Sequence, residues 1–404
     1  MRVLLAPHGT RGDVQPMLAL ARALRDRGHE AAFSAPENFV AWIRRLGFEA
    51  QSNGINVETI LQEPGADLHS LRWQLRHLTE LAEALFAAVG RSSDADLIVG
   101  SGIQLAATSV AESRGVPSVF AAFCPCALPS RSAPPPPIKT QTLPRWLNRL
   151  LWDVGGLGTS WVLRSHINRG RSALGLRGVD DVLDSLAGDL AIVAADRDLA
   201  PLADDAPERA EATDAWVLDD DVALEPHVDA FLSRDPAPVY VGFGSMIARH
   251  VPALAAAAVA AVRASGRPVL VSGGWAGLDR FVEPAGDLLV AGALPHGAVL
   301  PRVSAVVHHG GAGTTTAAAR AGVPQVIVPH ILDQYYWAHR VAALGLGPRA
   351  IPADLVTADI LAERVETALL DPVIASRARA LAPAIRARNG AADAVARLEQ
   401  LVGG

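Results

Sequence analysis

The feature that most constrains this 404-residue chain is a strand, a glycine-rich turn, a helix and a second strand in direct succession. Residues 303–307 have the continuous apolar character of a buried parallel strand, and residues 325–329 repeat it. Between them the alanine-rich residues 315–321 favour a helix, which Gly322 and Pro324 end. A β-α-β unit of this kind places its two strands in a parallel sheet.

The turn in this unit reads His-His-Gly-Gly-Ala-Gly-Thr-Thr-Thr, from residue 308 to residue 316. A glycine turn that opens a helix leaves backbone N–H groups free at the positive end of the helix dipole. The alternative is a tight turn that merely requires glycine. We favour a phosphate or diphosphate site, because several glycines and a threonine coincide with a helix start. The predicted diphosphate ligands are His309, Gly310, Gly311, Gly313 and Thr314, together with Ser245 at another glycine-rich strand end.

The strand-turn-helix order recurs along most of the chain, which predicts an α/β fold with doubly wound parallel sheets. A chain of this length exceeds one ordinary core, so we expect two Rossmann-like domains facing a central cleft. The predicted divisions are a first domain (1–215), an acidic, proline-containing linker (216–235), a second domain (236–380) and a C-terminal helix that can pack back on the first domain (381–404).

Composition excludes several classes of protein. Half of the residues are hydrophobic and the net charge is -6, which indicates a globular protein without the basic footprint of nucleic-acid binding. No apolar run reaches the roughly 18 residues of a membrane span, and the first residues do not form a signal peptide. Cys124 and Cys126 are interpreted as packed thiols. A cytoplasmic enzyme is therefore expected.

The turn after the first strand contains two titratable residues. It lacks the G-x-G-x-x-G spacing of a dinucleotide site, which argues against NAD or FAD. Asp13 stands where the first helix starts, either as a cap that accepts a backbone hydrogen bond or as a general base at the cleft. His8 is a rival for the base, although a strand-end histidine more often packs or hydrogen-bonds.

Two further segments bear on ligands. Asp333 and Gln334 follow the strand 325–329, where they either cap a surface helix or bind sugar hydroxyls, which donate and accept hydrogen bonds. Residues 129–145 form a proline-rich loop before a predicted helix, 146–174. This region suits an acceptor cleft, although packing against the sheet explains it equally well. The candidate acceptor-region residues are His8, Pro134, Pro137 and Trp146.

Taken together, these motifs resemble a known family. Residues 309–314, Asp333-Gln334 and the N-terminal Gly-Thr-Arg-Gly-Asp-Val-Gln-Pro of residues 9–16 are similar to those of bacterial UDP-sugar-dependent glycosyltransferases of the GT-B fold. These belong to family 1 and include glycopeptide-antibiotic, macrolide and sterol glycosyltransferases. The resemblance extends over nearly the whole chain and is densest at 295–346.

The resemblance implies roles for individual residues. Asp13 matches the catalytic base, and Ser245, His309, Gly311 and Thr314 match the diphosphate site. Asp333 and Gln334 match donor-sugar contacts, and Leu294 to His296 match the segment that reads the uracil or thymine ring. Many relatives carry an aromatic residue where this chain has Ala293, which leaves Trp275 as a candidate for stacking on the nucleobase. No acidic partner for the base can be identified. The residues so assigned to nucleobase binding are Trp275, Leu294 and His296.

The implied activity is an inverting transfer of a sugar from a UDP- or dTDP-sugar to a hydroxyl of an apolar natural-product or sterol-like acceptor. No metal and no cofactor beyond the nucleotide sugar are expected, since the helix N-terminus supplies the positive charge. The chain is expected to be a monomer or weak homodimer. A nucleotide-sugar epimerase of the same fold, or a non-catalytic helper of a glycosyltransferase, remains the alternative.

Overall fold

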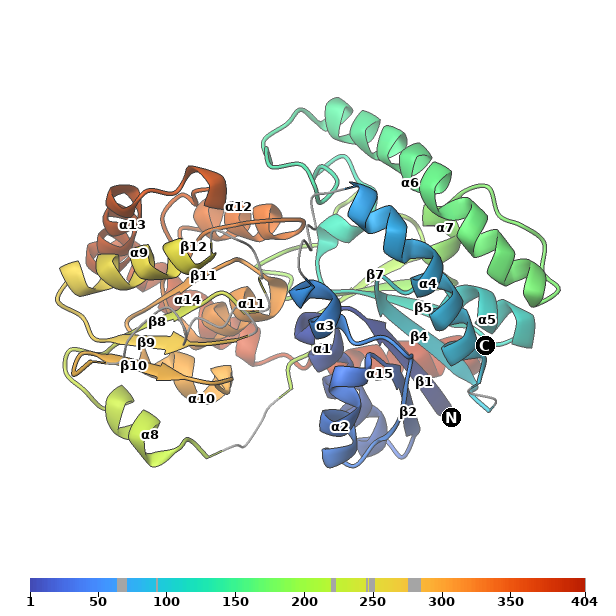
Figure 1. Cartoon of the computed structure of the whole chain (residues 1–404), viewed down its shortest axis with the longest axis horizontal. Helices are drawn as coiled ribbons and strands as arrows, with labels where there is room; N and C mark the ends of the chain where they lie inside the picture. The colour runs from blue at the N-terminus through green and yellow to red at the C-terminus, as the bar shows by residue number, and fades with distance from the viewer. Residues whose placement is uncertain are drawn as a thin grey trace.

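The computed structural model describes residues 1–63, 71–91, 94–218, 223–244, 246, 251–274 and 285–403. Two parallel sheets lie side by side, each between layers of helices (Figure 1). The first has the order β3-β2-β1-β4-β5-β6-β7 and the second β10-β9-β8-β11-β12. These are two doubly wound Rossmann-like domains, which confirms the predicted fold class.

The N-terminal sheet is built from strands whose side chains are buried on both faces, as helix-covered parallel strands require. Its strands are β1 (Arg2–His8), β2 (Glu30–Ala35), β3 (Glu49–Ser52), β4 (Leu97–Gly102), β5 (Ser118–Ala122), β6 (Leu190–Ala194) and β7 (Ala210–Thr213). Its helices are α1 (Arg11–Asp26), α2 (Glu37–Arg45), α3 (Val57–Gln62), α4 (Leu71–Gly90), α5 (Ala107–Arg114), α6 (Arg145–Ala173) and α7 (Val182–Leu186).

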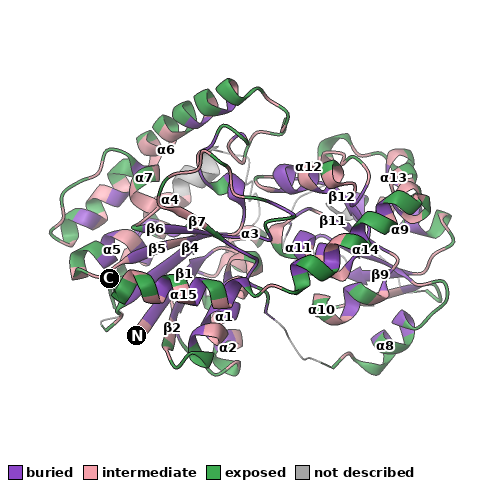
Figure 2. Cartoon of the chain, turned by 180° about the vertical axis from the view of Figure 1, so that it is seen from behind, coloured by how far each residue is buried: buried purple, intermediate pink, exposed green. Residues whose placement is uncertain are grey.

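The C-terminal sheet contains β8 (Val239–Gly242), β9 (Val269–Ser272), β10 (Leu288–Ala291), β11 (Ala305–His308) and β12 (Gln325–Ile327). Its buried strands lie between helices on both sides, coloured purple where covered in Figure 2. The helices of this half are α8 (Pro226–Leu232), α9 (Val251–Ala264), α10 (His296–Val299), α11 (Ala312–Ala321), α12 (Gln334–Leu344), α13 (Ala358–Leu370) and α14 (Pro372–Arg386), and the chain ends with α15 (Gly390–Gly403).

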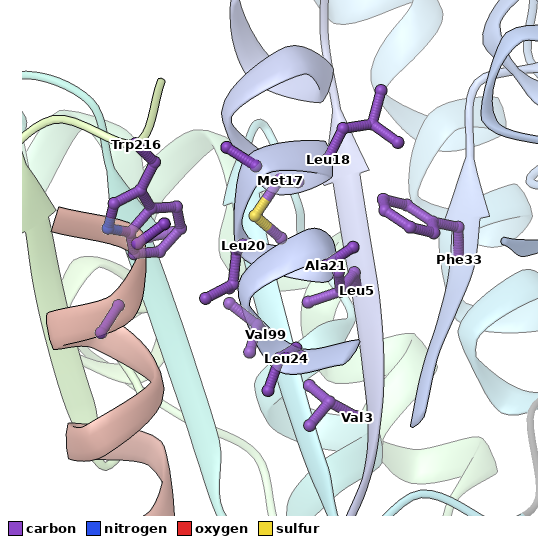
Figure 3. Packing of buried hydrophobic residues seen from close by; sticks show 14 of the residues in the cluster. Val3, Leu5, Met17, Leu18, Leu20, Ala21, Leu24, Phe33, Val99 and Trp216 are labelled. Carbon is purple, nitrogen blue, oxygen red and sulfur yellow. The ribbon is translucent and has the colours of Figure 1, made fainter. Parts of the chain in front are cut away.

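The core of the N-terminal domain lies between its sheet and helices α1 and α15. Met17, Leu20 and Leu24 of α1 pack on Leu5 of β1 (Figure 3). Trp216, just after the N-terminal sheet, packs into the same cluster beside α15 (Figure 3). The C-terminal helix thus crosses back to the first domain and completes its core.

Two segments near the domain boundary have specific packing. The predicted linker, 216–235, has residues packed in both domains. Trp216 packs in the core of the first domain, and Phe231 of α8 packs in the core of the second. The chain returns to the first domain at the start of α15. It is close-packed there at Gly390, where a Cβ atom would overlap the carbonyl oxygen of Asp214. On the far side, Glu399 of α15 accepts a hydrogen bond from Arg27 Nε at 3.2 Å.

One predicted element differs in its bounds. The sequence predicts a helix over 101–114, whereas β4 continues to Gly102 and α5 begins only at Ala107. The Gln104 side chain occupies the intervening turn, donating to the carbonyl of Ala6 at 3.2 Å and accepting from the N–H of Ala106 at 3.0 Å. These two bonds satisfy backbone groups that a longer helix would have paired internally.

Candidate active site between the two domains

A cleft of about 2750 Å³ lies between the two domains. The strand order reverses at β1/β4 in the first sheet and at β8/β11 in the second. These are the switch points at which open α/β sheets bind ligands, outside the carboxyl ends of the strands. The turns after β1, β4, β8 and β11 all line the cleft, and α1 and α11 begin near the domain boundary (Figure 1).

Asp13 lies at the N-terminus of α1, on the wall of this cleft. Thr10 is the N-cap residue, and Asp13 is its partner in a capping box, with Oδ2 accepting from the N–H of Thr10 at 2.8 Å. A Cβ atom on Gly102 would lie 2.8 Å from Asp13 Oδ1, so this glycine leaves room for the carboxyl group. The N-cap is therefore Thr10 and not Asp13, which supports the cap from the third position of the helix while its carboxyl group lines the cleft.

Two carboxyl groups from different domains face the same cleft. Burial and, to a smaller extent, the charge of Asp333 raise the pKa of Asp13 to about 7, against the opposing effect of the Thr10 hydrogen bond. Burial likewise raises the pKa of Asp333 to about 6, opposed by its hydrogen bond from Trp337 Nε1 at 3.0 Å. A carboxyl group with a pKa near 7 is suited to accept a proton from a substrate hydroxyl at neutral pH.

His8, the rival base, is a buried hydrogen-bonding residue at the end of β1. Its Nδ1 accepts from Asn53 Nδ2 at 3.1 Å, because the amide oxygen of Asn53 accepts from the N–H of Ile55. Burial lowers the pKa of His8 to about 4, which keeps the ring neutral at pH 7. His8 also lines the cleft, next to Asp13.

The glycine turn after β11 is held by a buried histidine that the sequence analysis did not single out. His308 Nδ1 accepts from the N–H of Gly310 at 3.1 Å, and Nε2 lies 3.0 Å from Gln325 Oε1. Gln325 in turn donates to the carbonyl of Thr315 at 3.3 Å. Gly310 has a φ of +88°, and a Cβ there would lie 2.6 Å from a methyl group of Ile327. The turn is therefore rigid before any ligand arrives.

The start of α11 offers its backbone to the cleft. Gly311 is the N-cap, and no side chain caps the helix. His309 lies over this glycine, with Nε2 only 2.5 Å from where a Cβ would be. Burial lowers the pKa of His309 to about 4, so the ring is a neutral hydrogen-bonding group. Gly311, Gly313, Thr314 and His309 line the cleft, whereas Gly310 supports the turn from behind.

Leu294, just before α10, and His296, the first residue of that helix, both lie in the cleft wall. His296 Nε2 lies 3.2 Å from the hydroxyl of Tyr240, and the two rings meet edge to face at 5.6 Å. Burial, helped by the charge of Arg11 from the other domain, lowers the pKa of His296 to about 4. Arg11, which the sequence analysis missed, stands two residues before Asp13 in the same turn.

Asp333 and Gln334 lie differently although they are adjacent. Gln334 Oε1 accepts from the N–H groups of His330 and Ile331 at 2.8 and 3.2 Å, and Nε2 lies 3.3 Å from Met246 Sδ. Gln334 thus braces the loop that presents Asp333. Leu332, which directly precedes Asp333 in this loop, has a φ of +51° and is 49 % exposed in the cleft.

The acceptor-region residues separate in the structure. Pro137 lines the cleft, whereas Pro134 is buried and Trp146 faces solvent outside the cleft lining. The proline-rich loop is held to α6 by Trp152, whose Nε1 donates to the carbonyl of Ala133 at 3.0 Å. In the described part of the chain, four exposed apolar residues also line the cleft. Trp161 belongs to the helix that was expected to suit an acceptor, whereas no local sequence signal marked Ile103, Val217 and Leu332.

Two predicted donor-site residues, Ser245 and Trp275, lie outside the described residues. Within the described ranges, no group of three or more His, Cys, Asp or Glu side chains is placed to hold a metal ion. No helix in that part of the chain is both long and apolar enough to cross a membrane.

Comparison with known proteins follows the same two halves. Residues 3–128 match the glycosyltransferase family 28 N-terminal domain, and residues 283–401 match the erythromycin biosynthesis protein CIII-like C-terminal domain. The chain is 37 % identical to glycosyltransferase GtfE of Amycolatopsis orientalis, over 98 % of this chain and 96 % of the relative. It is also 37 % identical to the vancomycin aglycone glucosyltransferase of that organism, with the same coverage of 98 % and 96 %.

Among solved structures, the glycosyltransferase VinC in complex with dTDP matches with a TM-score of 0.73 at 20 % identity, covering 100 % of both chains. That likeness concerns the fold. The sequence relatives above extend over nearly the whole chain at a level of identity that identifies the family. The chain is therefore a glycosyltransferase and belongs to family 1 of the GT-B fold.

Proposed function

We propose that this glycosyltransferase moves a sugar from a UDP- or dTDP-sugar to a hydroxyl group of an apolar natural product, with inversion at the anomeric carbon. The observation that carries the proposal is the convergence of three groups on one cleft: the Asp13 carboxyl, the open N-terminus of α11, and Asp333. The relative that acts on the vancomycin aglycone supports an acceptor of the natural-product class.

The acceptor hydroxyl needs a general base because its own pKa lies far above 7. Asp13, with a pKa near 7, takes the hydroxyl proton as the oxygen attacks the anomeric carbon. Attack from the side opposite the nucleotide inverts the configuration in one displacement. Thr10 holds the Asp13 carboxyl through its N–H and so fixes the direction of Oδ1.

The leaving nucleoside diphosphate gains negative charge as the sugar–oxygen bond breaks. The N–H groups of the first turn of α11 stabilise that charge, and His309 contributes a neutral N–H donor. The rigid His308 brace keeps these groups in place without reorganisation. In this proposal the helix N-terminus replaces a metal ion, and no cofactor is needed beyond the nucleotide sugar.

The acceptor class follows from the apolar side chains that project into the cleft. Ile103 is 58 % exposed and Trp161 76 % exposed, and both line the cleft, as do the more buried Phe123 and Trp216, whose rings meet edge to face. Exposed aliphatic and aromatic groups around one carboxyl favour a large apolar molecule that presents a hydroxyl. The C-terminal face of the cleft is left for the donor.

The proposal is tested by separating donor binding from turnover. Thermal shift against UDP- and dTDP-sugars identifies the donor, and a mass-shift screen of hydroxylated natural products identifies the acceptor. Asp13→Asn should keep the donor-induced shift and lose turnover by orders of magnitude. Near-normal turnover of Asp13→Asn would refute the base, and conversion of donor to a new sugar isomer without acceptor would indicate an epimerase.

A further inference from the structure

The outer face of α6 carries a continuous row of exposed apolar side chains. Trp146, Leu150, Val154, Leu157 and Trp161 are 68, 48, 58, 74 and 76 % exposed. At about 100° per residue their spacing places all five within an arc of about 80°, over a length of roughly 22 Å. We call this row the α6 stripe. It runs along the outer edge of the N-terminal domain, where α6 is largely exposed (Figures 1 and 2).

Single exposed apolar residues are common on protein surfaces, but a contiguous row of them marks an interaction site. The other side of α6 makes the contacts that the helix has with the rest of the chain. Trp152 and Ile167 pack inward, and Val162 lines the cleft. The α6 stripe is therefore not needed for packing within the described part of the chain, and an external partner would explain its composition.

The order of side chains in the stripe identifies the partner. Read from either end it is Trp-Leu-Val-Leu-Trp, with its midpoint between Asp153 and Val154. In an isologous contact, each residue of one copy meets a different residue of the other, and the relation is reciprocal. Two antiparallel α6 helices related by a two-fold axis at this midpoint place Trp146 against Trp161 and Leu150 against Leu157.

One glycine borders the stripe near its midpoint. Gly158 lies about 80° around the helix from the centre of the stripe and carries no side chain that would hold a second helix away. A Cβ atom on Gly158 would contact nothing within 4 Å, so the space above it is open. The two tryptophans alone could bury roughly 300 Å² per copy, a large share of the about 800 Å² that each partner contributes to a standard interface.

The charges along α6 favour a protein partner over an anionic lipid surface. Arg149 pairs with Asp153 at 3.0 Å, Arg145 with Asp204 at 3.4 Å, and Arg164 with Asp180 at 3.4 Å. These pairs neutralise the arginines that would otherwise attract anionic headgroups. An apolar row bordered by neutralised charges has the composition of an interface core with a polar rim.

We propose that the α6 stripe is the contact of a symmetric homodimer in which two α6 helices pack antiparallel. The dimer does not depend on the proposed function. One consequence of the dimer does rest on the proposed function. Because Trp161 lines the cleft, the contact brings the second copy's Trp146 to the cleft mouth. Trp146→Ala should then raise the KM for the acceptor and leave the KM for the donor unchanged.

Analytical ultracentrifugation of the full chain over a concentration series tests the dimer. The wild type should reach twice 42.3 kDa. Leu157→Glu should remain at the single-chain mass with an unchanged melting temperature, since Leu157 is 74 % exposed in the single chain. Leu370→Glu, which alters a residue of α13 that is 69 % exposed outside the stripe, is the matched control and should dimerise normally. A wild type that stays at 42.3 kDa at its highest soluble concentration would overturn the proposal.

Cross-linking tests the antiparallel register. Val154→Cys, beside the axis, should form an intermolecular disulfide under mild oxidation, whereas Trp146→Cys should not. An equal mixture of Trp146→Cys and Trp161→Cys should cross-link. The natural thiols Cys124 and Cys126 are buried and should not interfere. Self-linking of Trp146→Cys would refute the register. Binding of a single-chain wild type to phosphatidylcholine vesicles, lost in Leu157→Glu, would assign the stripe to a lipid surface instead.

Discussion

The raised pKa of Asp13 predicts a specific dependence of transfer on pH. If Asp13 is the base, its ionised fraction controls kcat/KM for the acceptor. With a pKa of about 7, roughly 1 % of the carboxyl is ionised at pH 5, and nearly all of it at pH 9. We therefore expect kcat/KM to rise about a hundredfold between these pH values, whereas an aspartate of ordinary pKa would change it by only about 1.1-fold.

The assay measures initial rates of product formation by liquid chromatography and mass spectrometry, with saturating donor and limiting acceptor. Burial holds the pKa values of three cleft histidines, His8, His296 and His309, at about 4, so these three rings stay neutral throughout the pH range of the assay. Asp333, with a pKa of about 6, does titrate in the same window. The Asp333→Asn variant separates the two carboxyl groups.

In Asp333→Asn the remaining inflection belongs to Asp13 and should move to lower pH. The reason is that the negative charge of Asp333 no longer opposes ionisation of Asp13. The residual rate of Asp13→Asn should show no such inflection. A profile that is flat between pH 5 and 9 in the wild type, or an inflection that survives in Asp13→Asn, would refute the reasoning.

Three further predictions concern stability and binding. Because folding raises the pKa of Asp13 from 3.8, its contribution to stability is present below pH 4 and is lost as pH rises through 7. Asp13→Asn should therefore melt at a higher temperature than wild type at pH 8, and the difference in melting temperature should close toward pH 4. An equal difference at both pH values would contradict this. His308→Ala removes a buried partner of Gly310 and Gln325 and should lower the free energy of unfolding, measured by urea titration, by about 3 kcal/mol. His309→Ala should instead chiefly weaken donor binding, measured by calorimetry. Similar unfolding curves for the two variants would count against the bracing role of His308. Leu332→Gly relieves a backbone φ of +51° and should raise the free energy of unfolding by about 1 kcal/mol. The same variant should raise the KM for the acceptor. A loss of stability would show that no strain is present.

Much of the fold could be predicted from the sequence because its signals are local. Buried parallel strands are short apolar runs, and the turns that end them contain glycine at positions such as Gly310, whose backbone requires it. The glycine turn after β11 and Asp13 were singled out for the same reason, since each lies within a few residues of a recognisable strand end, and their proposed roles stay predictions. The strands β6 and β7 and the brace by His308 were missed, because their partners lie far away in the sequence or outside the turn itself.

The placement of side chains relative to one another could not be predicted in this way. Nothing near Gln334 in the sequence indicates that its amide turns inward to the loop, or that Trp146 faces solvent while Trp161 lines the cleft. These outcomes depend on which face of an element the rest of the molecule covers. The return of α15 to the first domain is likewise a result of packing, with Glu399 bonded to Arg27 across 372 residues.

The sequence by itself thus determined the type of fold, the positions of the two ligand-facing turns and the chemical character of their residues. Only the tertiary structure brought Asp13 and Asp333 into one cleft and gave both carboxyl groups raised pKa values. The physical reason is that turn chemistry is set by a few neighbouring residues, whereas a cleft is set by how two domains are held. Here contacts between the domains such as Arg320 to the buried Asp196, at 3.1 Å, hold them, and the two partners are separated by 124 residues.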